Sequence, residues 1–372
     1  RCHFEQPALC PPHSSGSNFV KSQSIAVDQP QYVESIQAGR GIAALLVVIH
    51  HAAQKAHALS GGAIPLFDFG IIGVDIFFMI SGFIIYFVTA NKTMTHVEFM
   101  EKRIIRVFPL YWGLSLLALV VFMLAPKLIN SNAQEPTDIA ASFFLWPTSA
   151  PYLVNNGWTL TYEIIFYGLW ALVALPTARP RNAYLACLVL AAASFIGLLS
   201  GLDYKVMNFS LFLEFAFGVA IGVAFKKGLI RQSTPVSIVL MAAGAFLAHL
   251  AISEGLGSSE LRGFALAIPS AMIFFGLISL GAFWARLRVI LAIGDSSYSL
   301  YLFHPFILVA IPLTVKLLGF TSVPQILAIS VAICIASIWA SHMVYRFVEF
   351  PLTQMMRGMI KSAKSFSAAR AR

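Results

Sequence analysis

The sequence predicts an all-α, polytopic integral membrane protein with about ten transmembrane helices. Of its 372 residues, 58% are hydrophobic and only 11% are charged, whereas a soluble globular domain carries about 25% charged residues. The mean hydropathy is +0.79. Apolar runs of about 20 residues, the length needed to cross a bilayer, recur along the chain. They lie near residues 36–56, 70–90, 106–125, 157–176, 183–201, 207–225, 236–252, 262–281, 294–315 and 324–347.

Only short segments remain outside these runs. Residues 1–34 are expected to form a disordered cytoplasmic leader, because most of this stretch is rich in proline, serine and glutamine and lacks an apolar core of signal-peptide length. The first methionine is Met79, and one hypothesis is that natural translation begins at a non-methionine codon such as the one for Val27. Residues 35–351 then form a ten-helix transmembrane domain, and residues 352–372 form a basic cytoplasmic tail.

Lysine and arginine are distributed unequally between the two sides of the membrane that this span count defines. With a cytoplasmic N-terminus, the inner segments carry sixteen of these residues and the outer segments carry five. Such a bias places both termini in the cytoplasm. The basic residues are scattered over the connections, so the net charge of +9 indicates topology rather than a nucleic-acid-binding surface. The four cysteines show no spacing typical of a zinc site or a disulfide framework.

The first span contains the most informative pair of residues, Arg40 and His51. At about 100° per residue, their separation of eleven positions is three turns plus roughly 20°, so both side chains share one helix face and lie about 16 Å apart along it. His50 points away from that face. Ionisable groups inside a span are costly and usually face a protein interior or a wet cavity. The alternative is that Arg40 anchors the helix at the interface and His51 is an interhelical hydrogen-bond donor.

The second span contains the motif Gly73-Val-Asp-Ile-Phe-Phe-Met-Ile-Ser-Gly-Phe. Asp75 is a lone carboxylate within an apolar run, and such a group needs a partner, which favours a functional or orienting role. Ser81 and Gly82 are typical of close helix packing instead.

The third span opens with the basic motif Lys102-Arg-Ile-Ile-Arg-Val-Phe-Pro-Leu-Tyr-Trp. A basic cluster with aromatic residues such as Tyr111 behind it can hold phosphate groups. Arg103 and Arg106 are three positions apart and therefore share a face, which makes them candidate phosphate ligands. A topology anchor explains Lys102 equally well.

Further candidates lie in the fourth, ninth and tenth spans. The fourth contains Trp158-Thr-Leu-Thr-Tyr162-Glu163, in which Glu163 is a carboxylate about two turns into the helix and could accept a proton, orient a histidine or bind a hydroxyl group. The ninth contains Tyr301 and His304, and His304 either supports the site or marks a kink before Pro305. The motif Arg346-Phe-Val-Glu349 in the tenth predicts a structural ion pair. No metal-ligand cluster or nucleotide-binding loop is present in the sequence.

Together these motifs resemble the membrane-bound acyltransferase-3 family. They occur in the family's order from about Ser35 to Pro351, and the opening Ser35-Ile-Gln-Ala-Gly-Arg-Gly looks most like rhizobial exopolysaccharide O-acetyltransferases. The chain differs from the family where its fourth-span motif has Thr159, Thr161 and the single acid Glu163 in place of serines and two acids. The matching stretches begin at Arg40, Gly73, Arg103, Trp158, Ser297 and Glu349.

The resemblance implies transfer of an acyl group, usually acetyl from cytoplasmic acetyl-CoA, to a hydroxyl of an extracytoplasmic or lipid-linked exopolysaccharide at the bacterial inner membrane. In that interpretation His51, Arg40 and Glu163 are catalytic, and His51 either deprotonates the sugar or carries the acyl group. The donor is held by Arg40, Arg103, Arg106 and Tyr111, and no metal is needed. The acceptor or supporting residues are Asp75, Trp158, Tyr162, Tyr301 and His304.

A different class of function remains open at this point. A proton-coupled transporter or flippase of lipid-linked glycans could use Arg40, His51 and Glu163 as a proton relay. The absence of internal repeats and the shared face of Arg40 and His51 favour the enzyme. Turnover of acetyl-CoA separates the two hypotheses, because a flippase does not use a thioester.

Overall fold

The computed structural model describes residues 29–90, 94–126, 136–174, 180–202 and 205–370, and within these ranges the chain is helical with no strands. The long helices are α1 (Gln29–Leu59), α2 (Ile72–Thr89), α3 (His96–Leu124), α5 (Gly157–Val173), α6 (Pro180–Leu199), α7 (Phe212–Lys226), α8 (Thr234–Ser253), α9 (Arg262–Ser279), α13 (Val323–Val344) and α14 (Phe350–Arg370). The shorter helices and turns are η1 (Asp68–Ile71), α4 (Ile139–Phe144), η3 (Phe209–Leu211), η4 (Leu256–Ser258), η5 (Gly281–Arg286), α10 (Arg288–Asp295), α11 (Ser297–Leu308), α12 (Ala310–Leu318) and η6 (Tyr345–Glu349).

The described part of the chain contains nine helices that are long and apolar enough to cross a membrane. A tenth, α5, has 17 residues, which is the lower limit for a span. Large apolar side chains point outward from the bundle, with Leu124 81% and Leu317 84% exposed. Such exposure is tolerated in lipid rather than in water. The predicted fold class, an all-α polytopic membrane protein, is confirmed.

Several helices are longer than the sequence predicts. The first span begins at Gln29, inside the predicted leader, whose residues 1–28 lie outside the described ranges. The third begins at His96, because Thr95 caps it by accepting a hydrogen bond from the Glu98 backbone N–H at 3.1 Å. At the other end, α14 continues as a helix to Arg370 through the predicted tail. The hydropathy pattern therefore did not predict where side-chain capping begins a helix or where a helix continues beyond its apolar run.

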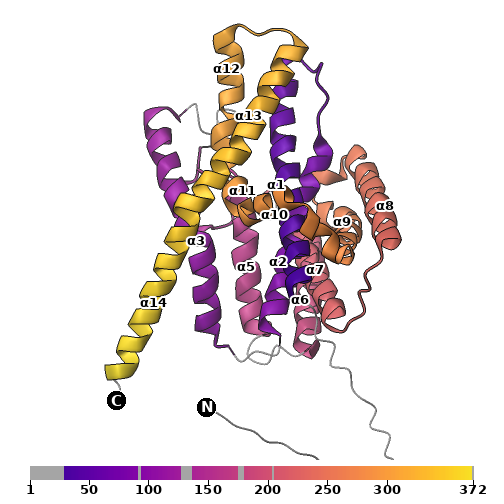
Figure 1. Cartoon of the computed structure of the whole chain (residues 1–372), viewed down its shortest axis with the longest axis vertical. Helices are drawn as coiled ribbons and strands as arrows, with labels where there is room; N and C mark the ends of the chain where they lie inside the picture. Colours follow the sequence, from indigo (N-terminus) through magenta and orange to yellow (C-terminus); the bar gives the residue numbers. More distant parts are fainter. Residues whose placement is uncertain (1–28, 91–93, 127–135, 175–179, 203–204, 371–372) are drawn as a thin grey trace, which may run out of the picture.

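The ninth span, predicted as one helix over 294–315, is divided into α11 and α12 at Val309. The cause is Pro312, which has no N–H and whose ring crowds the carbonyl of Leu308 one turn earlier. Immediately before α11, the short helix α10 lies across the middle of the molecule against α1 (Figure 1). Its Gly294 is required there, because a Cβ atom would collide with the backbone carbonyl of Gln37.

The last span contains a single π-helical turn, η6, between α13 and α14. Pro351 lies just beyond it, and its ring would clash with the Phe347 carbonyl in a regular α-helix. The wider turn relieves that clash, and π-turns of this kind are frequent at functional sites. Here the turn leaves Glu349 only 2% exposed and directed into the protein.

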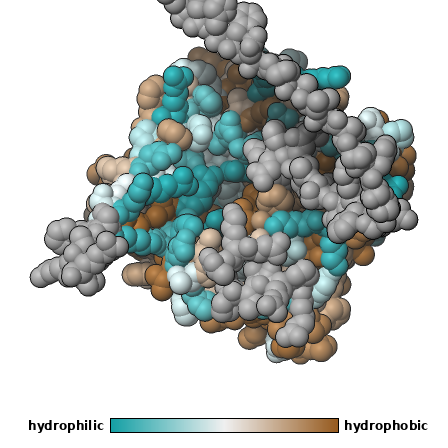
Figure 2. Space-filling model, turned by 60° about the horizontal axis from the view of Figure 1, so that its bottom comes forward, coloured by the Kyte–Doolittle hydropathy of each residue, from teal (hydrophilic) through white to brown (hydrophobic). Residues whose placement is uncertain are grey.

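The two ends of the bundle differ in character. In Figure 1 the loop between α12 and α13 lies at the top, and α14 ends at the bottom beside the start of α3. We call this lower end the basic face, because it carries Lys226, Lys227 and Arg231 between α7 and α8 together with Lys364 of α14. Figure 2 turns this face toward the viewer, and hydrophilic residues gather in its middle while hydrophobic residues lie along its rim.

The most extensive contact between two helices is that of α2 with α7, where glycines face backbone atoms. A Cβ atom on Gly218 would collide with the Met79 carbonyl, and one on Gly82 would collide with the Phe215 carbonyl. Replacing Gly218 with leucine is therefore expected to lower the melting temperature in detergent strongly, since overpacking costs about 1–3 kcal/mol or more. Gly113 is the matched control, because a Cβ atom there meets nothing within 4 Å. Equal melting temperatures for the two variants would contradict this packing.

Candidate functional site

A cavity of about 210 Å³ lies inside the bundle and is lined by α1, α2, α3, α5 and the start of α11. On α2 its lining extends from Val74 to Ile85, which is about 16 Å along the helix axis. Most of the wall is apolar. Its polar wall residues include five that the sequence analysis had singled out, namely Arg40, Arg103, Arg106, Glu163 and Tyr301.

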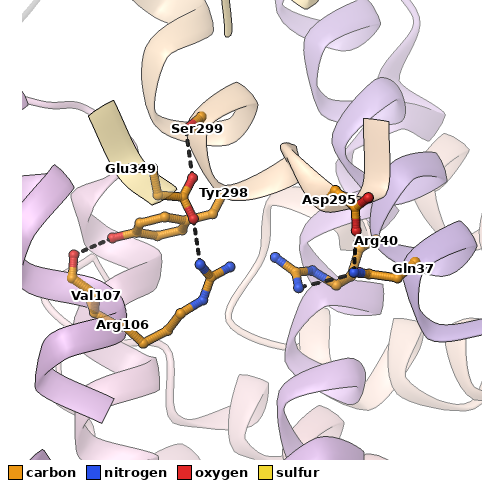
Figure 3. Close-up of polar contacts among 8 residues, drawn as sticks. All are labelled: Gln37, Arg40, Arg106, Val107, Asp295, Tyr298, Ser299 and Glu349. Atoms are coloured by element: carbon orange, nitrogen blue, oxygen red, sulfur yellow. Dashed lines mark hydrogen bonds and ion pairs between the residues drawn. The ribbon is translucent and has the colours of Figure 1, made fainter. Parts of the chain in front are cut away.

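Two of the three arginines face one another across the cavity. Figure 3 shows Arg106 of α3 and Arg40 of α1 directing their guanidinium groups toward each other. Arg106 donates a hydrogen bond to the buried Glu349 carboxylate and lies 5.1 Å from the centre of the Tyr298 ring. The other oxygen of Glu349 accepts a hydrogen bond from Ser299 at 2.6 Å. Glu349 thus pairs with Arg106, and the predicted pair with Arg346 is wrong, because the π-turn directs Glu349 inward.

Arg40 is held less tightly than Arg106. Its guanidinium donates a hydrogen bond of 3.5 Å to Gln37, whose amide in turn donates to Asp295 at 2.6 Å (Figure 3). Burial raises the pKa of the Asp295 carboxyl, and the nearby Arg40 charge opposes that shift. Arg40 therefore keeps donor groups available to a ligand in the cavity.

Arg103 is the arginine with the fewest partners. Its guanidinium lies 5.6 Å from the centre of the Phe99 ring and 5.8 Å from that of Tyr167. Its Nε atom is buried without a hydrogen bond, and Arg103 forms no ion pair within the described ranges. A guanidinium stacked on aromatic rings and lacking a carboxylate partner suits a bound phosphate.

Glu163 faces the cavity from α5 in a fixed orientation. One of its oxygens accepts hydrogen bonds from the Ser81 hydroxyl, at 2.9 Å, and from the Tyr167 hydroxyl. Ser81 and Tyr167 were missed as site residues. The signal for Ser81 was ambiguous, because the Ser-Gly step also serves helix packing, and Gly82 does pack against Phe215.

His51 does not line the cavity but belongs to a histidine pair beside it. His51 Nδ1 lies 2.8 Å from His304 Nε2, and His304 Nδ1 lies 2.9 Å from the Leu300 carbonyl. A carbonyl only accepts, so Nδ1 of His304 carries the proton. With His304 neutral, its Nε2 accepts from His51 Nδ1–H, and the lone pair of His51 is left on Nε2. This nitrogen makes no hydrogen bond within the described part of the chain.

Two aromatic rings separate this histidine pair from the cavity. Tyr301 lines the cavity and lies 5.6 Å from the ring of Phe77 and 6.2 Å from the ring of His304, measured between ring centres. Its hydroxyl is hydrogen-bonded to Thr159 at 2.9 Å, and its carbonyl accepts from Asn156 at 2.7 Å. His51 is thus linked to the cavity end formed by Tyr301 through its partner His304.

Four of the predicted residues lie elsewhere. Tyr111 is fully buried and donates a hydrogen bond to the Ser142 carbonyl at 2.5 Å, so it supports α4 rather than the cavity. Asp75 pairs with Arg262 at 2.8 Å, the partner that its position required. Trp158 and Tyr162 line a second cavity on the other side of α5.

The sequence analysis did not identify one buried acid, Glu214. Glu214 of α7 is 0% exposed, and its carboxyl group lies close enough to the Asp75 carboxyl group and to Arg262 to interact with both. The sequence does contain a signal for Glu214, since it is the one carboxylate in the apolar run 207–225. No group of three or more potential metal ligands occurs among the residues that the structure describes.

Comparison with known proteins identifies the family of the chain. The model of the acyltransferase-3 family, described as an acyltransferase domain, matches residues 33–342. The exopolysaccharide production protein ExoZ of Rhizobium meliloti (strain 1021) is 30% identical over 274 residues, which is 70% of this chain and 81% of that protein. The putative membrane-bound transacylase BcsY of Komagataeibacter xylinus is 28% identical over 309 residues, or 73% and 72% of the two chains.

A third relative is longer than this chain. The O-acetyltransferase OatA of Staphylococcus aureus (strain NCTC 8325 / PS 47) is 26% identical over 320 residues, which cover 74% of this chain but only 50% of OatA. No solved structure matches the chain. The family match spans most of the chain, including every helix that lines the cavity. The chain therefore belongs to the acyltransferase-3 family and is a membrane O-acyltransferase.

Proposed function

We propose that this enzyme transfers an acetyl group from cytoplasmic acetyl-CoA to a hydroxyl group of an extracytoplasmic or lipid-linked exopolysaccharide. The observation that carries the proposal is one cavity that begins among three arginines and ends at Tyr301, whose ring lies beside that of His304, the hydrogen-bond partner of His51. Two relatives support the same acceptor and acyl group, since ExoZ is an exopolysaccharide production protein and OatA is an O-acetyltransferase.

The donor suits the arrangement of charge along the cavity. CoA consists of a polyanionic nucleotide and a long, narrow pantetheine arm that ends in the thioester. Arg103 and Arg40 would bind the phosphates, because guanidinium groups pair with phosphate oxygens in a bidentate manner. Arg40 lies about 16 Å along α1 from His51, so it acts at the phosphate end rather than at the thioester. Glu163, fixed by Ser81 and Tyr167, would accept a hydrogen bond from an amide of the arm.

The chemistry is assigned to His51. Its Nε2 lone pair removes the proton from the sugar hydroxyl, and the oxygen attacks the thioester carbonyl carbon. The new ester C–O bond forms as the C–S bond breaks, and the CoA thiolate leaves and takes up the proton. His304 holds His51 in the tautomer that leaves Nε2 unprotonated, since it accepts the Nδ1 proton at 2.8 Å. His304 is in turn fixed by the Leu300 carbonyl.

The direct test uses purified full-length protein in detergent with radiolabelled acetyl-CoA. We expect thioester consumption that depends on de-O-acylated exopolysaccharide and yields labelled polysaccharide. Failure to bind or consume acetyl-CoA would overturn the proposal and would favour the glycan transporter hypothesis.

The proposed topology places both termini and the basic face in the cytoplasm of a bacterial inner membrane. Reporter tags at the C-terminus and within residues 226–235 are expected to report the cytoplasm, and tags within residues 136–156 the periplasm. The physical reason is the concentration of lysine and arginine on the basic face. A periplasmic C-terminus would contradict this orientation and would move the arginines away from cytoplasmic acetyl-CoA.

A further inference from the structure

A second cavity, of about 190 Å³, lies on the other side of α5 and is not used by the proposed transfer step. It is built where three connections meet, those before α5, before η3 and before α9. Asn208 ties these parts together, because its backbone N–H donates to the Tyr162 hydroxyl at 2.5 Å and its amide donates to the Ser259 carbonyl at 3.0 Å. These three helices begin at the end of the bundle opposite the basic face.

The lining of this cavity combines aromatic rings with hydrogen-bonding groups. Trp158 is half-buried, and its ring meets that of Tyr162 nearly at a right angle, with 5.9 Å between ring centres. Hydroxyl groups of Thr161 and Ser258 lie in the same wall, and among the described residues no aspartate or glutamate does. The volume equals about six waters at the liquid density, which is comparable to one sugar ring. An apolar ring face surrounded by convergent polar groups is what a pyranose, with its C–H faces and rim of hydroxyls, requires.

Arg262 supplies a pre-organised donor to this cavity. Its Nη2 atom donates to Asp75 at 2.8 Å and to the Ile71 carbonyl at 3.2 Å, while its Nε lies 3.4 Å from the same carboxylate. Its Nη1 makes no hydrogen bond within the described ranges. The ion pair with Asp75 therefore fixes the guanidinium and leaves one nitrogen to donate to a ligand hydroxyl.

The cavity is also connected to the catalytic side of the protein through η1. Ile71, at the end of η1, contacts the cavity wall by accepting the Arg262 hydrogen bond. Gly70, one residue earlier, packs so closely on α1 that a Cβ atom would lie 2.6 Å from the Cβ of His50. The short helix η1 therefore lies between the second cavity and the turn of α1 that carries His50 and His51.

We infer that this cavity binds one sugar ring of the acceptor glycan, at a distance from the hydroxyl that is acylated. The inference rests on the proposed function for the identity of the glycan as an acceptor. Trp158 stacks on the ring, Arg262 Nη1 donates to it, and the reacting sugar is a neighbour in the same chain. The cavity would then determine which position along the polysaccharide reaches His51.

The test uses full-length protein in detergent, with oligosaccharides from de-O-acylated host exopolysaccharide as the probe. Ser258 is exposed and its hydroxyl donates no hydrogen bond within the described ranges, so Ser258→Trp fills the cavity without disturbing the core. We expect Ser258→Trp and Trp158→Ala to raise the KM for the oligosaccharide by about tenfold or more, with acetyl-CoA affinity unchanged. Trp158→Phe should restore most of the loss. Trp146→Ala is the control, because Trp146 is 71% exposed and lies outside the cavity.

An unchanged oligosaccharide KM in both Ser258→Trp and Trp158→Ala would overturn the inference while leaving the proposed transfer intact. Saturation-transfer NMR distinguishes failure of the glycan-site inference from failure of the proposed acetyl transfer. If wild-type protein neither binds nor consumes acetyl-CoA, saturation transfer to the oligosaccharide that is lost in Ser258→Trp still supports a glycan site here. Absence of saturation transfer in the wild type would overturn it.

Discussion

Replacing His51 with alanine is expected to lower the turnover number of acetyl transfer by about 10²–10⁴-fold, the usual contribution of a general base. The remaining contacts of α1 do not depend on the imidazole, so the variant should insert and fold. The structure gives the reason for the size of the effect, because the His304 contact at 2.8 Å leaves the His51 lone pair on Nε2. The measurement is the turnover number of purified protein with saturating acetyl-CoA and acceptor.

Two neighbouring histidines serve as controls for this prediction. His50 donates to the Phe67 carbonyl at 2.8 Å and accepts from Gln54 at 3.1 Å. His50→Ala should therefore cost about 1 kcal/mol of stability for the lost hydrogen bond and little activity per folded molecule. His304→Ala should reduce turnover less than His51→Ala and shift the pH–rate profile, since the base remains but loses its tautomeric support. An essential His50 together with a dispensable His51 would contradict the assignment.

The first span was the most predictable part of the site. The eleven-residue spacing placed Arg40 and His51 on one face, and in the structure both lie beside α11, Arg40 near Tyr298 in the shared cavity and His51 against His304. Helical periodicity was sufficient to predict the shared face because both residues lie on one uninterrupted helix. The sequence left open whether His304 marks a kink or supports the site, and the structure adds a 2.8 Å contact with His51 across 253 positions.

Ion pairs between residues far apart in the chain could not be predicted from the sequence. Asp75 was recognised as needing a partner, but hydropathy gave no means of choosing Arg262, 187 positions away. Glu349 was assigned to the wrong arginine for a similar reason. Spacing of three predicts contact in a regular helix, and the π-turn before Pro351 breaks that rule.

The division of the predicted site between two cavities could not be predicted from the sequence either. Residues 158–163 look like one motif in the sequence, but they are divided between two faces of α5. Thr159 and Glu163 line the arginine cavity, while Trp158 and Tyr162 line the second one. A helix that separates two cavities produces the same apolar pattern as a helix with one buried face.

Arg103→Lys is expected to raise the KM for acetyl-CoA by about tenfold, equivalent to about 1.4 kcal/mol. A lysine keeps the charge but offers one point of contact where the guanidinium offers two to a phosphate. Arg103 has no carboxylate partner within the described ranges, and under the proposed function its donors serve a ligand rather than the fold. The melting temperature and the acceptor KM should therefore stay unchanged. The measurement is acetyl-CoA kinetics of purified variants at fixed acceptor concentration.

Arg106→Lys should behave differently, although it raises the donor KM as well. Arg106 is paired with the buried Glu349, and a lysine keeps the charge there but does not reproduce the geometry of the guanidinium contact. We expect a lower melting temperature, reproduced by Glu349→Gln, in addition to the weaker donor binding. Lys102→Ala is the matched control, because Lys102 is exposed and pairs with Glu98 at 2.7 Å outside the cavity. If Arg103→Lys and Lys102→Ala gave the same donor KM as the wild type, Arg103 would be a topology anchor and the phosphates would have to bind elsewhere.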